Sequence, residues 1–244
     1  MKLKTEIVKN DLFDYTDRYI YQRVDSFKFS LDSILLAEFV TLNKNIKNIL
    51  DLCTGNAPIP LILSKYTNAS ITGFEIQKDI YDLAIKSVDC NKLNNQIKLI
   101  NDDINNIDNY KLNKFDIITC NPPFFKIDNE NDLNKSNNLS IARHEITINL
   151  DEIFKVVDNY LKDNGTFYMV HRLDRIDEIV LKLNEQKLKL KEIQLIITKN
   201  DSAPNIALFK IKKHAKPGVK INKIINVNEL DTYQKLFKDG SIWN

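Results

Sequence analysis

The stretch that decides the fold is Phe115-Asp116-Ile117-Ile118-Thr119-Cys120-Asn121-Pro122-Pro123-Phe124. It begins with an apolar run typical of a buried strand, and a short amide, two prolines and a ring follow at once. Each proline fixes its own φ and lacks an N–H, and Pro122 keeps Asn121 out of the helical region. The Asn121 side-chain oxygen and nearby carbonyl oxygens are therefore acceptors at the carboxyl end of a strand, where open α/β sheets bind their ligands.

Phe124 adds a flat apolar ring beside these acceptors. Hydrogen-bond acceptors next to a ring suit a planar amine, such as the amino group of a nucleobase or an amide. The same tetrapeptide also fits a proline turn that does no more than end a strand, which is what most Asn-Pro pairs do. The rest of the chain decides between the two interpretations.

The composition fits one large α/β domain. The chain has 244 residues, of which 43% are hydrophobic, and this is enough for a sizeable core. We expect a single domain over residues 1–244, with an N-terminal extension over 1–29 and an α/β core over 30–244. The formal net charge is +2, so the chain lacks the global basic field of a protein held on duplex DNA by charge alone. Any nucleic-acid contact must come from a local patch.

The cysteines and the apolar runs indicate the cellular compartment of the protein. Cys53, Cys90 and Cys120 form no C-x-x-C pair, which argues against a disulfide framework and against a zinc site, and we expect no metal. This pattern favours a reduced, cytoplasmic location. Long apolar runs and a signal-peptide core are absent from the sequence, which predicts neither a secreted nor a membrane-spanning protein.

From residue 48 onward, apolar strand-like runs alternate with segments of helical period. This alternation predicts a mostly parallel sheet with helices on both faces. The predicted strands are Ile49–Leu52, Ser70–Glu75, Ile97–Ile100, Phe115–Cys120, Thr166–Val170, Ile193–Thr198 and Ile206–Ile211.

Helices are predicted between these strands and before them. Asn149, followed three residues later by Glu152, predicts a capping box at the start of one helix, and Ser30 is the expected cap of the first helix. The helical patterns cover Leu31–Phe39, Pro58–Leu63, Ile80–Val88 and Ile153–Leu161.

The connections carry further information. Only turn residues separate the last two predicted strands, which is too short for a helical crossover, so we expect this pair to be antiparallel. Two segments escape the alternation, namely the first thirty or so residues and the stretch Lys126–Ser140. The second is rich in Asn and Asp, and it is either a lid beside the site or a solvated linker.

Asp51-Leu52-Cys53-Thr54-Gly55-Asn56-Ala57 follows the first strand of the predicted sheet. Gly55 permits a tight strand-to-helix turn, and Asp51 can accept a hydrogen bond from a ligand ammonium group. The stretch lacks the G-x-G-x-x-G glycines that let a dinucleotide pyrophosphate approach the backbone, which disfavours NAD or FAD and an oxidoreductase.

Two further strand ends carry acids. Glu75 lies where an acidic residue grips the two ribose hydroxyls of a nucleoside, although a solvated strand-end acid is the alternative. Asp102 and Asp103 follow the third strand, where a carboxylate can accept from the exocyclic amine of an adenine; we expect one of the two to serve only as a turn former. The joint pattern over four strand ends is more specific than any of its members.

With these motifs the chain resembles the class I S-adenosylmethionine-dependent methyltransferases, in the group marked by Asn-Pro-Pro-Tyr/Phe. More narrowly, it is similar to the bacterial tRNA1(Val) adenine-37 amino-methyltransferases over nearly its whole length, from about Asp11 to beyond Ile225. The residues that carry this similarity are Ser26-Phe27-Lys28-Phe29-Ser30-Leu31-Asp32, Gly73-Phe74-Glu75-Ile76-Gln77, Asn121-Pro122-Pro123-Phe124-Phe125, Ala142-Arg143-His144-Glu145 and Met169-Val170-His171-Arg172.

The resemblance implies a Rossmann-like class I methyltransferase fold, with a seven-stranded mostly parallel sheet and an antiparallel last strand. It also implies S-adenosyl-L-methionine as cofactor and methylation of the 6-amino group of an adenosine in tRNA, with position 37 of the anticodon stem-loop of valine tRNA as the expected target. The expected catalytic residues are Asn121, Pro122, Pro123 and Phe124; the expected cofactor contacts are Phe29, Ser30, Asp51, Cys53, Gly55, Glu75, Ile76, Asp103, Ile104 and Asn121; the expected substrate contacts are Arg143, His144, Arg18 and Arg23.

Alternatives stay open at this point. The chain departs from the family at Cys53 and Ala57, where glycines are usual. This departure motivates a second hypothesis, a cofactor-binding or RNA-binding module without turnover. A third keeps the chemistry and changes the substrate, to a guanine amino group of ribosomal RNA or a glutamine of a release factor. The basic and aromatic residues of the N-terminal segment, Arg18 and Arg23 among them, form either an RNA-facing edge or a packed cover over the sheet.

Overall fold

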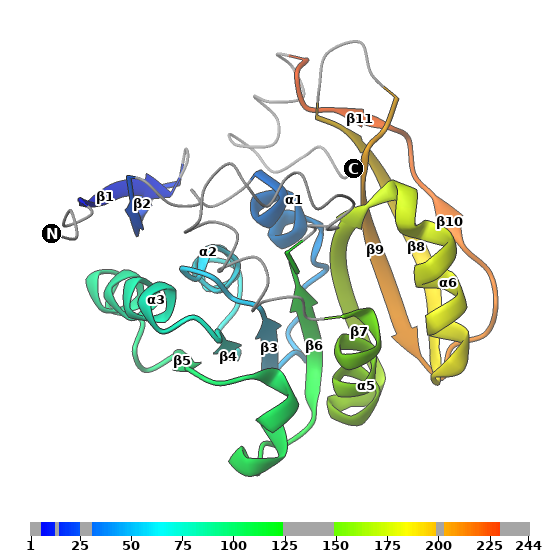
Figure 1. Cartoon of the computed structure of the whole chain (residues 1–244), viewed down its shortest axis with the longest axis horizontal. Helices are drawn as coiled ribbons and strands as arrows, with labels where there is room; N and C mark the ends of the chain where they lie inside the picture. Colours follow the sequence, from blue (N-terminus) through cyan, green and yellow to red (C-terminus); the bar gives the residue numbers. More distant parts are fainter. Residues whose placement is uncertain (1–5, 13–14, 25–30, 124–148, 199–202, 230–244) are drawn as a thin grey trace, which may run out of the picture.

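The fold is built around one large twisted sheet (Figure 1). The computed structural model describes residues 6–12, 15–24, 31–123, 149–198 and 203–229. Along the sheet the strands follow the order β10-β8-β9-β7-β6-β3-β4-β5, and β11 also pairs with β8. The strands are β3 (Asn48–Leu52), β4 (Ser70–Phe74), β5 (Ile97–Ile100), β6 (Phe115–Cys120), β7 (Leu161–Arg172), β8 (Leu188–Ile197), β9 (Ile206–Lys213), β10 (Lys220–Ile221) and β11 (Ile225–Asn226).

The direction of the strands confirms the predicted architecture. From β5 to β7 all neighbours are parallel, whereas β9 is antiparallel to both β7 and β8. Every strand predicted from the sequence is present. The expected number of seven was too small, because the two short strands β10 and β11 extend the sheet beyond β8. Such two-residue strands leave no hydrophobic period in the sequence.

Helices cover both faces of the sheet, as the alternating pattern predicted. Ile49 of β3 belongs to the hydrophobic cluster on one face, and its neighbour Leu50 belongs to the cluster on the other. The first cluster includes residues of α1 (Leu31–Phe39), α2 (Pro58–Leu63) and α3 (Lys78–Cys90). The second includes residues of α5 (Leu150–Tyr160), α6 (Ile176–Glu185) and the 3-10 helix η1 (Ile104–Tyr110); the short η3 (Leu173–Arg175) precedes α6.

The start of α5 was predicted correctly and its end was not. The Asn149 side chain accepts from the Glu152 backbone N–H at 2.9 Å, and the Glu152 carboxylate accepts from the Asn149 N–H, so the capping box is present. The expected helix included Leu161, but this residue has extended backbone angles and opens β7. An apolar residue next to a helix end satisfies a helical and a strand pattern equally, which is why the boundary was misplaced.

The N-terminal segment forms a hairpin that the sequence pattern did not reveal. β1 (Ile7–Leu12) and β2 (Tyr15–Arg23) pair antiparallel as a separate two-stranded sheet. Leu12 and Ile20 are fully buried, and the first hydrophobic cluster includes both. The hairpin is therefore part of the packed structure and covers α2 and α3 (Figure 1).

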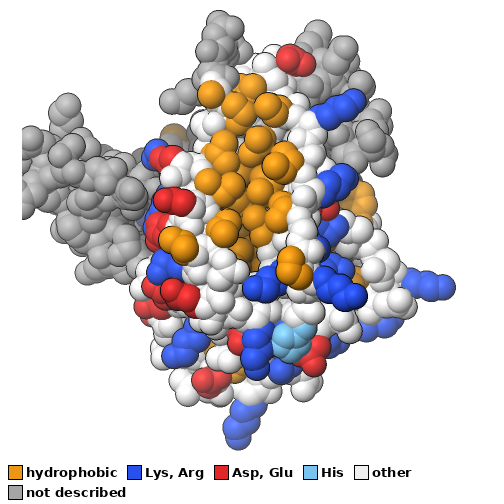
Figure 2. Space-filling model, turned by 90° about the vertical axis from the view of Figure 1, so that its right-hand side faces the viewer, with side chains coloured by type: hydrophobic (Ala, Val, Ile, Leu, Met, Phe, Trp, Pro, Cys, Tyr) orange, Lys and Arg blue, Asp and Glu red, His pale blue; other side chains and the backbone are white. Residues whose placement is uncertain are grey.

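One side of the molecule exposes a band of hydrophobic side chains, edged by charged side chains of both signs (Figure 2). This side carries the sheet edge formed by β8, β10 and β11, together with α6 (Figure 1). Ile221 of β10 is 67% exposed and Ile224 is 53% exposed. Within the described segments, none of the helices has both the length and the apolar character needed to cross a membrane.

Candidate active site

The carboxyl ends of four parallel strands lie in register along one edge of the sheet. Asp51 of β3 is opposite Thr119 of β6 and opposite Gly73 of β4, and Phe74 of β4 is opposite Ile100 of β5. The residues that follow these strands therefore gather at the same edge. This register brings together the strand-end motifs that were predicted to form one site.

Asp51 is the most deeply buried acid of this edge, with 0% of its surface exposed. Thr54 donates to Oδ2 and Thr119 donates to Oδ1, both at 2.5 Å. Burial raises the pKa of Asp51 to about 7; the two threonine hydrogen bonds oppose the shift and the nearby Glu75 adds to it. Among the described residues that shift this pKa, none is a cation. A ligand ammonium group would supply the missing positive charge.

Gly73 makes this arrangement possible because it has no side chain. A Cβ at residue 73 would lie 2.9 Å from the Thr54 Oγ1 and 2.8 Å from a methyl group of Leu99. The bare backbone of β4 lets Thr54 turn toward Asp51.

Glu75, directly after β4, organises the loop that follows β3. Its Oε2 accepts from the Gly55 N–H and its Oε1 accepts from the Gln77 N–H, both at 2.9 Å. The side chain is 5% exposed, and burial raises the pKa of its carboxyl group against the opposing backbone hydrogen bonds. Gly55 has a φ of +58°, and a Cβ there would meet no atom within 4 Å, so the loop faces open space.

Two residues of the same loop carry backbone strain. Cys53 has a φ of 57° and Ala57, which precedes α2, has a φ of 72°. The left-handed region is costly for residues with a Cβ. These are the two positions where the resembled family usually has glycine, a residue that adopts a positive φ without this cost. Cys53 and the buried Cys120 are free thiols joined by a hydrogen bond, and burial first, then this contact, raise the pKa of the Cys120 thiol.

The pair of acids after β5 mainly builds a turn. The Asp103 carboxylate accepts from the Asn105 N–H at 2.8 Å and caps η1. Asp102 accepts from the Asn106 side chain at 2.8 Å and from the Tyr110 hydroxyl at 2.7 Å. Ile104 is buried in the second hydrophobic cluster. The expected cofactor contacts at Asp103 and Ile104 remain predictions, as does the contact at Ile76, which is 44% exposed.

Asn121 lies at the end of β6, half-buried, with Pro122 buried and Pro123 exposed behind it. The Asn121 Nδ2 donates to the Ser33 Oγ of α1 at 2.8 Å. The remaining predicted site residues, Phe29, Ser30, Phe124, Arg143 and His144, lie outside the described residues, as does the stretch 126–140.

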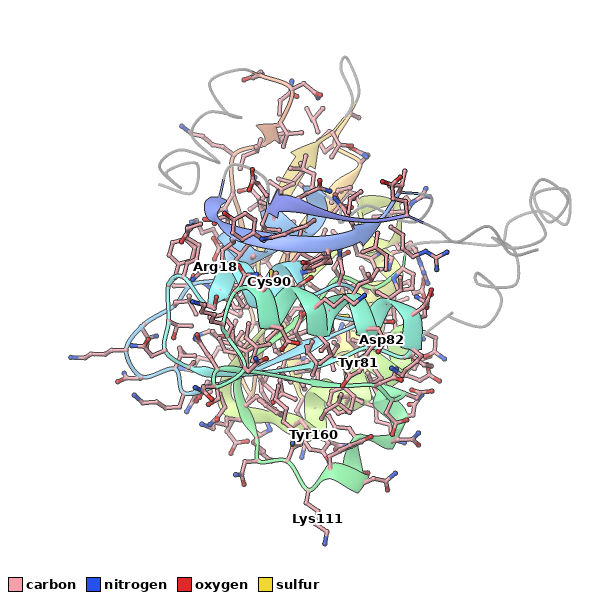
Figure 3. All side chains as sticks on the ribbon, turned by 90° about the vertical axis from the view of Figure 1, so that its left-hand side faces the viewer. Arg18, Tyr81, Asp82, Cys90, Lys111 and Tyr160 are labelled. Atoms are coloured by element: carbon pink, nitrogen blue, oxygen red, sulfur yellow. The ribbon has the colours of Figure 1, made fainter. Side chains whose placement is uncertain are left out.

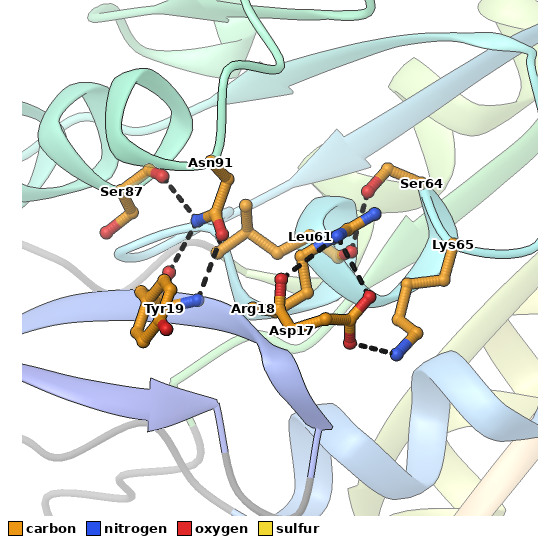
Figure 4. Close-up of polar contacts among 8 residues, drawn as sticks. All are labelled: Asp17, Arg18, Tyr19, Leu61, Ser64, Lys65, Ser87 and Asn91. Carbon is orange, nitrogen blue, oxygen red and sulfur yellow. Dashed lines mark hydrogen bonds and ion pairs between the residues drawn. The ribbon is translucent and has the colours of Figure 1, made fainter.

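The N-terminal hairpin is fixed to the core beside this edge. Asn91 at the end of α3 accepts from the Tyr19 N–H at 3.0 Å and donates to the Tyr19 carbonyl oxygen (Figure 4). Ser87 accepts from the Tyr21 N–H at 2.9 Å. Asn56 of the loop after β3 donates to the Tyr21 carbonyl oxygen at 2.9 Å. The hairpin is thereby joined to the loop that contains Gly55.

The two arginines predicted to contact substrate differ in their surroundings. Arg18 lies between the hairpin and α2, donates to Asp17 at 3.1 Å and is 18% exposed (Figures 3 and 4). Arg23 pairs with Asp79 of α3 at 2.8 Å and is 30% exposed. The packing interpretation of the N-terminal segment fits Arg18 best, and Arg23 is the more accessible cation.

Three residues of the site were missed by the sequence analysis, namely Thr54, Thr119 and Ser33. Thr54 and Thr119 lie inside the quoted motifs, and a hydroxyl two residues before the amide predicted to be catalytic is a signal that could have been used. Ser33 lies far away in the sequence, and nothing local marks it. Across the described segments, no group of three or more His, Cys, Asp or Glu side chains is arranged to hold a metal ion.

The fold and this edge together define a class I methyltransferase. The chain belongs to the methyltransferase small domain family, whose model matches residues 28–192. It is 25% identical, over 93% of its length and 96% of the relative, to a protein of Bacteroides fragilis named tRNA1(Val) (adenine(37)-N6)-methyltransferase.

Solved structures agree on the fold. A predicted O-methyltransferase from Agrobacterium tumefaciens superposes with a TM-score of 0.65 at 15% identity, covering 86% of this chain and 96% of that one. A tRNA m1G37 methyltransferase of M. jannaschii superposes with a TM-score of 0.60 at 14% identity, covering 88% of this chain and 56% of the other. At these identities the likeness establishes the Rossmann-like architecture.

Proposed function

We propose that this methyltransferase modifies the 6-amino group of an adenosine in tRNA, with position 37 of the anticodon loop of valine tRNA as its target. One observation carries the proposal. Asn121, which follows β6, lies beside the end of β3, where the buried Asp51 and the open loop at Gly55 are found. The name of the Bacteroides fragilis relative, which matches over nearly the whole length of both chains, supports this choice of substrate. A tRNA substrate also favours a cytoplasmic protein.

The methyl donor is S-adenosyl-L-methionine, which supplies an electrophilic methyl group on a sulfonium sulfur. The residues at the strand ends fit it chemically. Asp51 is a buried carboxylate that lacks a cation among its described neighbours, and a ligand ammonium group would lower its raised pKa. Glu75 would face the ribose hydroxyls, and the open space beside Gly55 would accept the bulk of a nucleoside. Phe29, Ser30, Cys53, Ile76, Asp103 and Ile104 complete the proposed cofactor contacts.

Asn121 and Pro122 would activate the amine. The lone pair of an adenine amino group is delocalised into the ring, so the group is a poor nucleophile. If the Asn121 Oδ1 and the Pro122 carbonyl oxygen each accept one amino proton, the nitrogen becomes more tetrahedral and its lone pair turns toward the donor. Removal of one preorganised partner of this type costs about 2.7–4 kcal/mol of barrier, by analogy with oxyanion-hole donors. Holding the reacting atoms in line adds a proximity contribution.

A loop nucleotide suits such a site better than a base within a duplex. Moving a base out of its stack costs a few kcal/mol, and stacking on an aromatic ring returns about 1–3 kcal/mol. Phe124 would provide that ring. Phosphate or base contacts are proposed for Arg143, His144, Arg18 and Arg23, and Arg23 is the accessible one of the two arginines on the described hairpin.

The test is methyl transfer from labelled S-adenosylmethionine to tRNA taken from cells that lack the modification. Nucleoside mass spectrometry of the product should show N6-methyladenosine, and sequencing should place it at position 37 of valine tRNA. Asn121→Ala should abolish transfer while the cofactor still binds within a few-fold. Asn164→Ala, at an exposed position of β7, is the matched control and should behave as wild type.

Four outcomes would contradict parts of the proposal. Labelling of ribosomal RNA or of a release factor in place of tRNA would move the substrate to another amine or amide. Cofactor binding with no transfer to any of these would leave a binding module. A loss of cofactor affinity in Asn121→Ala equal to the loss of activity would remove Asn121 from its role. Retained activity in Phe124→Ala would show that stacking is not needed.

A further inference from the structure

A hydrogen bond connects the first helix to the proposed catalytic amide. The Asn121 Nδ2 donates to the Ser33 Oγ at 2.8 Å, although the two residues are 88 positions apart in the chain. Ser33 is 5% exposed, and its neighbours Ile34, Leu35 and Leu36 in α1 are fully buried. The hydroxyl is therefore held by a helix that is packed into the core, which makes it a stiff reference point for a side chain at the end of β6.

The contact matters because a carboxamide has two ends of nearly the same shape and opposite hydrogen-bonding character. One end is an acceptor oxygen and the other is an NH₂ donor. The last torsion of an asparagine side chain is broad and roughly two-fold, so the amide can present either end. An Asn121 rotated by half a turn would set its own N–H groups against the N–H groups of the substrate amine. The hydrogen bond to Ser33 occupies the NH₂ end.

We propose that Ser33 is the positioning residue of the active site. By holding the Asn121 Nδ2, it directs Oδ1 toward the amine that receives the methyl group. Ser33 itself touches neither substrate nor reacting atoms and acts only through Asn121. The inference rests on the proposed function, because the orientation of the Asn121 amide matters only if Oδ1 accepts a hydrogen bond from the substrate amine. It predicts an effect on turnover that is separate from cofactor binding.

The kinetic test uses Ser33→Ala in the full-length chain. Loss of the hydrogen bond should lower kcat by about three- to tenfold, because the productive amide orientation then loses a stabilising contact. The dissociation constant for S-adenosylmethionine should stay within about two-fold of wild type. Ser33→Thr retains the hydroxyl and should recover most of the turnover. Ser64→Ala is the matched control and should leave kcat unchanged, because the Ser64 hydroxyl at the end of α2 donates to the Leu61 carbonyl oxygen at 2.7 Å, within its own helix.

A second measurement is independent of the substrate. The side-chain amide protons of Asn121, assigned in ¹⁵N NMR spectra by their absence in Asn121→Asp, should exchange with solvent at least about tenfold faster in Ser33→Ala. Unchanged exchange would overturn the inference, even if wild-type protein proved inactive on every tRNA. Faster exchange with unchanged kcat would overturn it as well, since the orientation would then be irrelevant to turnover. Absence of wild-type activity alone would count only against the proposed substrate.

Discussion

Thr119 of β6 donates a hydrogen bond of 2.5 Å to the Asp51 Oδ1 and so joins the ends of two neighbouring strands. Both residues are fully buried. Thr119 is also two positions before Asn121, so the acid proposed to meet the cofactor and the amide proposed to meet the substrate are fixed to the same short piece of β6.

Thr119→Val should weaken the binding of S-adenosylmethionine. The valine keeps the shape of the side chain and removes a hydrogen bond that favours the charged form of Asp51, so the pKa of Asp51 rises further. We expect about a tenfold loss of affinity at pH 7, measured by isothermal titration calorimetry. Thr72→Val, a partly buried position of β4, should leave affinity unchanged. If the affinity of Thr119→Val lies as far below that of the wild type at pH 8.5 as at pH 7, the loss is due to packing and not to the charge of Asp51.

The stability of the cofactor-free protein should depend on the ionisation of Asp51. Burial raises the pKa of its carboxyl group from an ordinary value of 3.8 to about 7. Between these values the folded state holds a proton that the unfolded state has lost, so the contribution of Asp51 to the free energy of unfolding falls as pH rises through this window. Asp51→Asn should remove this slope, as measured by urea unfolding at pH 5, 6, 7 and 8.

The exposed Asp89→Asn serves as control and should keep the slope of the wild type. An Asp51→Asn variant with the wild-type slope would mean that another buried group, such as Glu75, titrates in its place.

Ala57→Gly should relieve strain in the loop before α2. Ala57 has a φ of 72°, where a glycine has no steric cost, so we expect a gain of about 1 kcal/mol in the free energy of unfolding. Ala84→Gly, inside α3, is the opposite control, because a glycine there should cost about 1 kcal/mol. Chemical unfolding of the three proteins measures both effects. A loss of stability in Ala57→Gly would show that the buried methyl group contributes more than the strain.

Asn91→Ala should loosen the N-terminal hairpin. Asn91 donates to the carbonyl oxygens of Tyr19 and Ser87 and accepts from the Tyr19 N–H, and a partly buried backbone pair left without partners costs about 1–3 kcal/mol. Hydrogen–deuterium exchange of a peptide covering residues 15–24 should become faster. The exposed Asn94→Ala should leave it unchanged. Equal exchange in the wild type and Asn91→Ala would mean that Leu12 and Ile20 hold the hairpin by packing alone.

The central sheet could be predicted from the sequence because its strands are bounded by strong signals. Two prolines follow β6 directly after Asn121, and the capping box at Asn149 marks the start of a helix. The antiparallel direction of β9 followed from the length of one connection. Local pattern and tertiary structure agree at these places, which is where a prediction from one sequence is reliable.

The rest depended on contacts between distant residues. The hairpin β1–β2 is stabilised by side chains of α3, such as Asn91 and Ser87, which no local period reveals. The same holds for Ser33, whose link to Asn121 spans 88 positions. The positive φ angles of Cys53 and Ala57 were not predicted, because neither residue type favours this backbone conformation. Asp103 was expected to accept from the adenine amine of the cofactor, but its carboxylate already accepts from the Asn105 N–H.

The place of β9 between β7 and β8 has a consequence for how the chain matures on the ribosome. β7 and β8 are synthesised first, yet they are not neighbours in the sheet, because β9 lies between them. The last residue of β9 is Lys213. The exit tunnel must therefore release the chain as far as Lys213 before this half of the sheet can close. Until then β7 and β8 each keep an open edge, and nascent chains that stall before this point are the ones most exposed to aggregation.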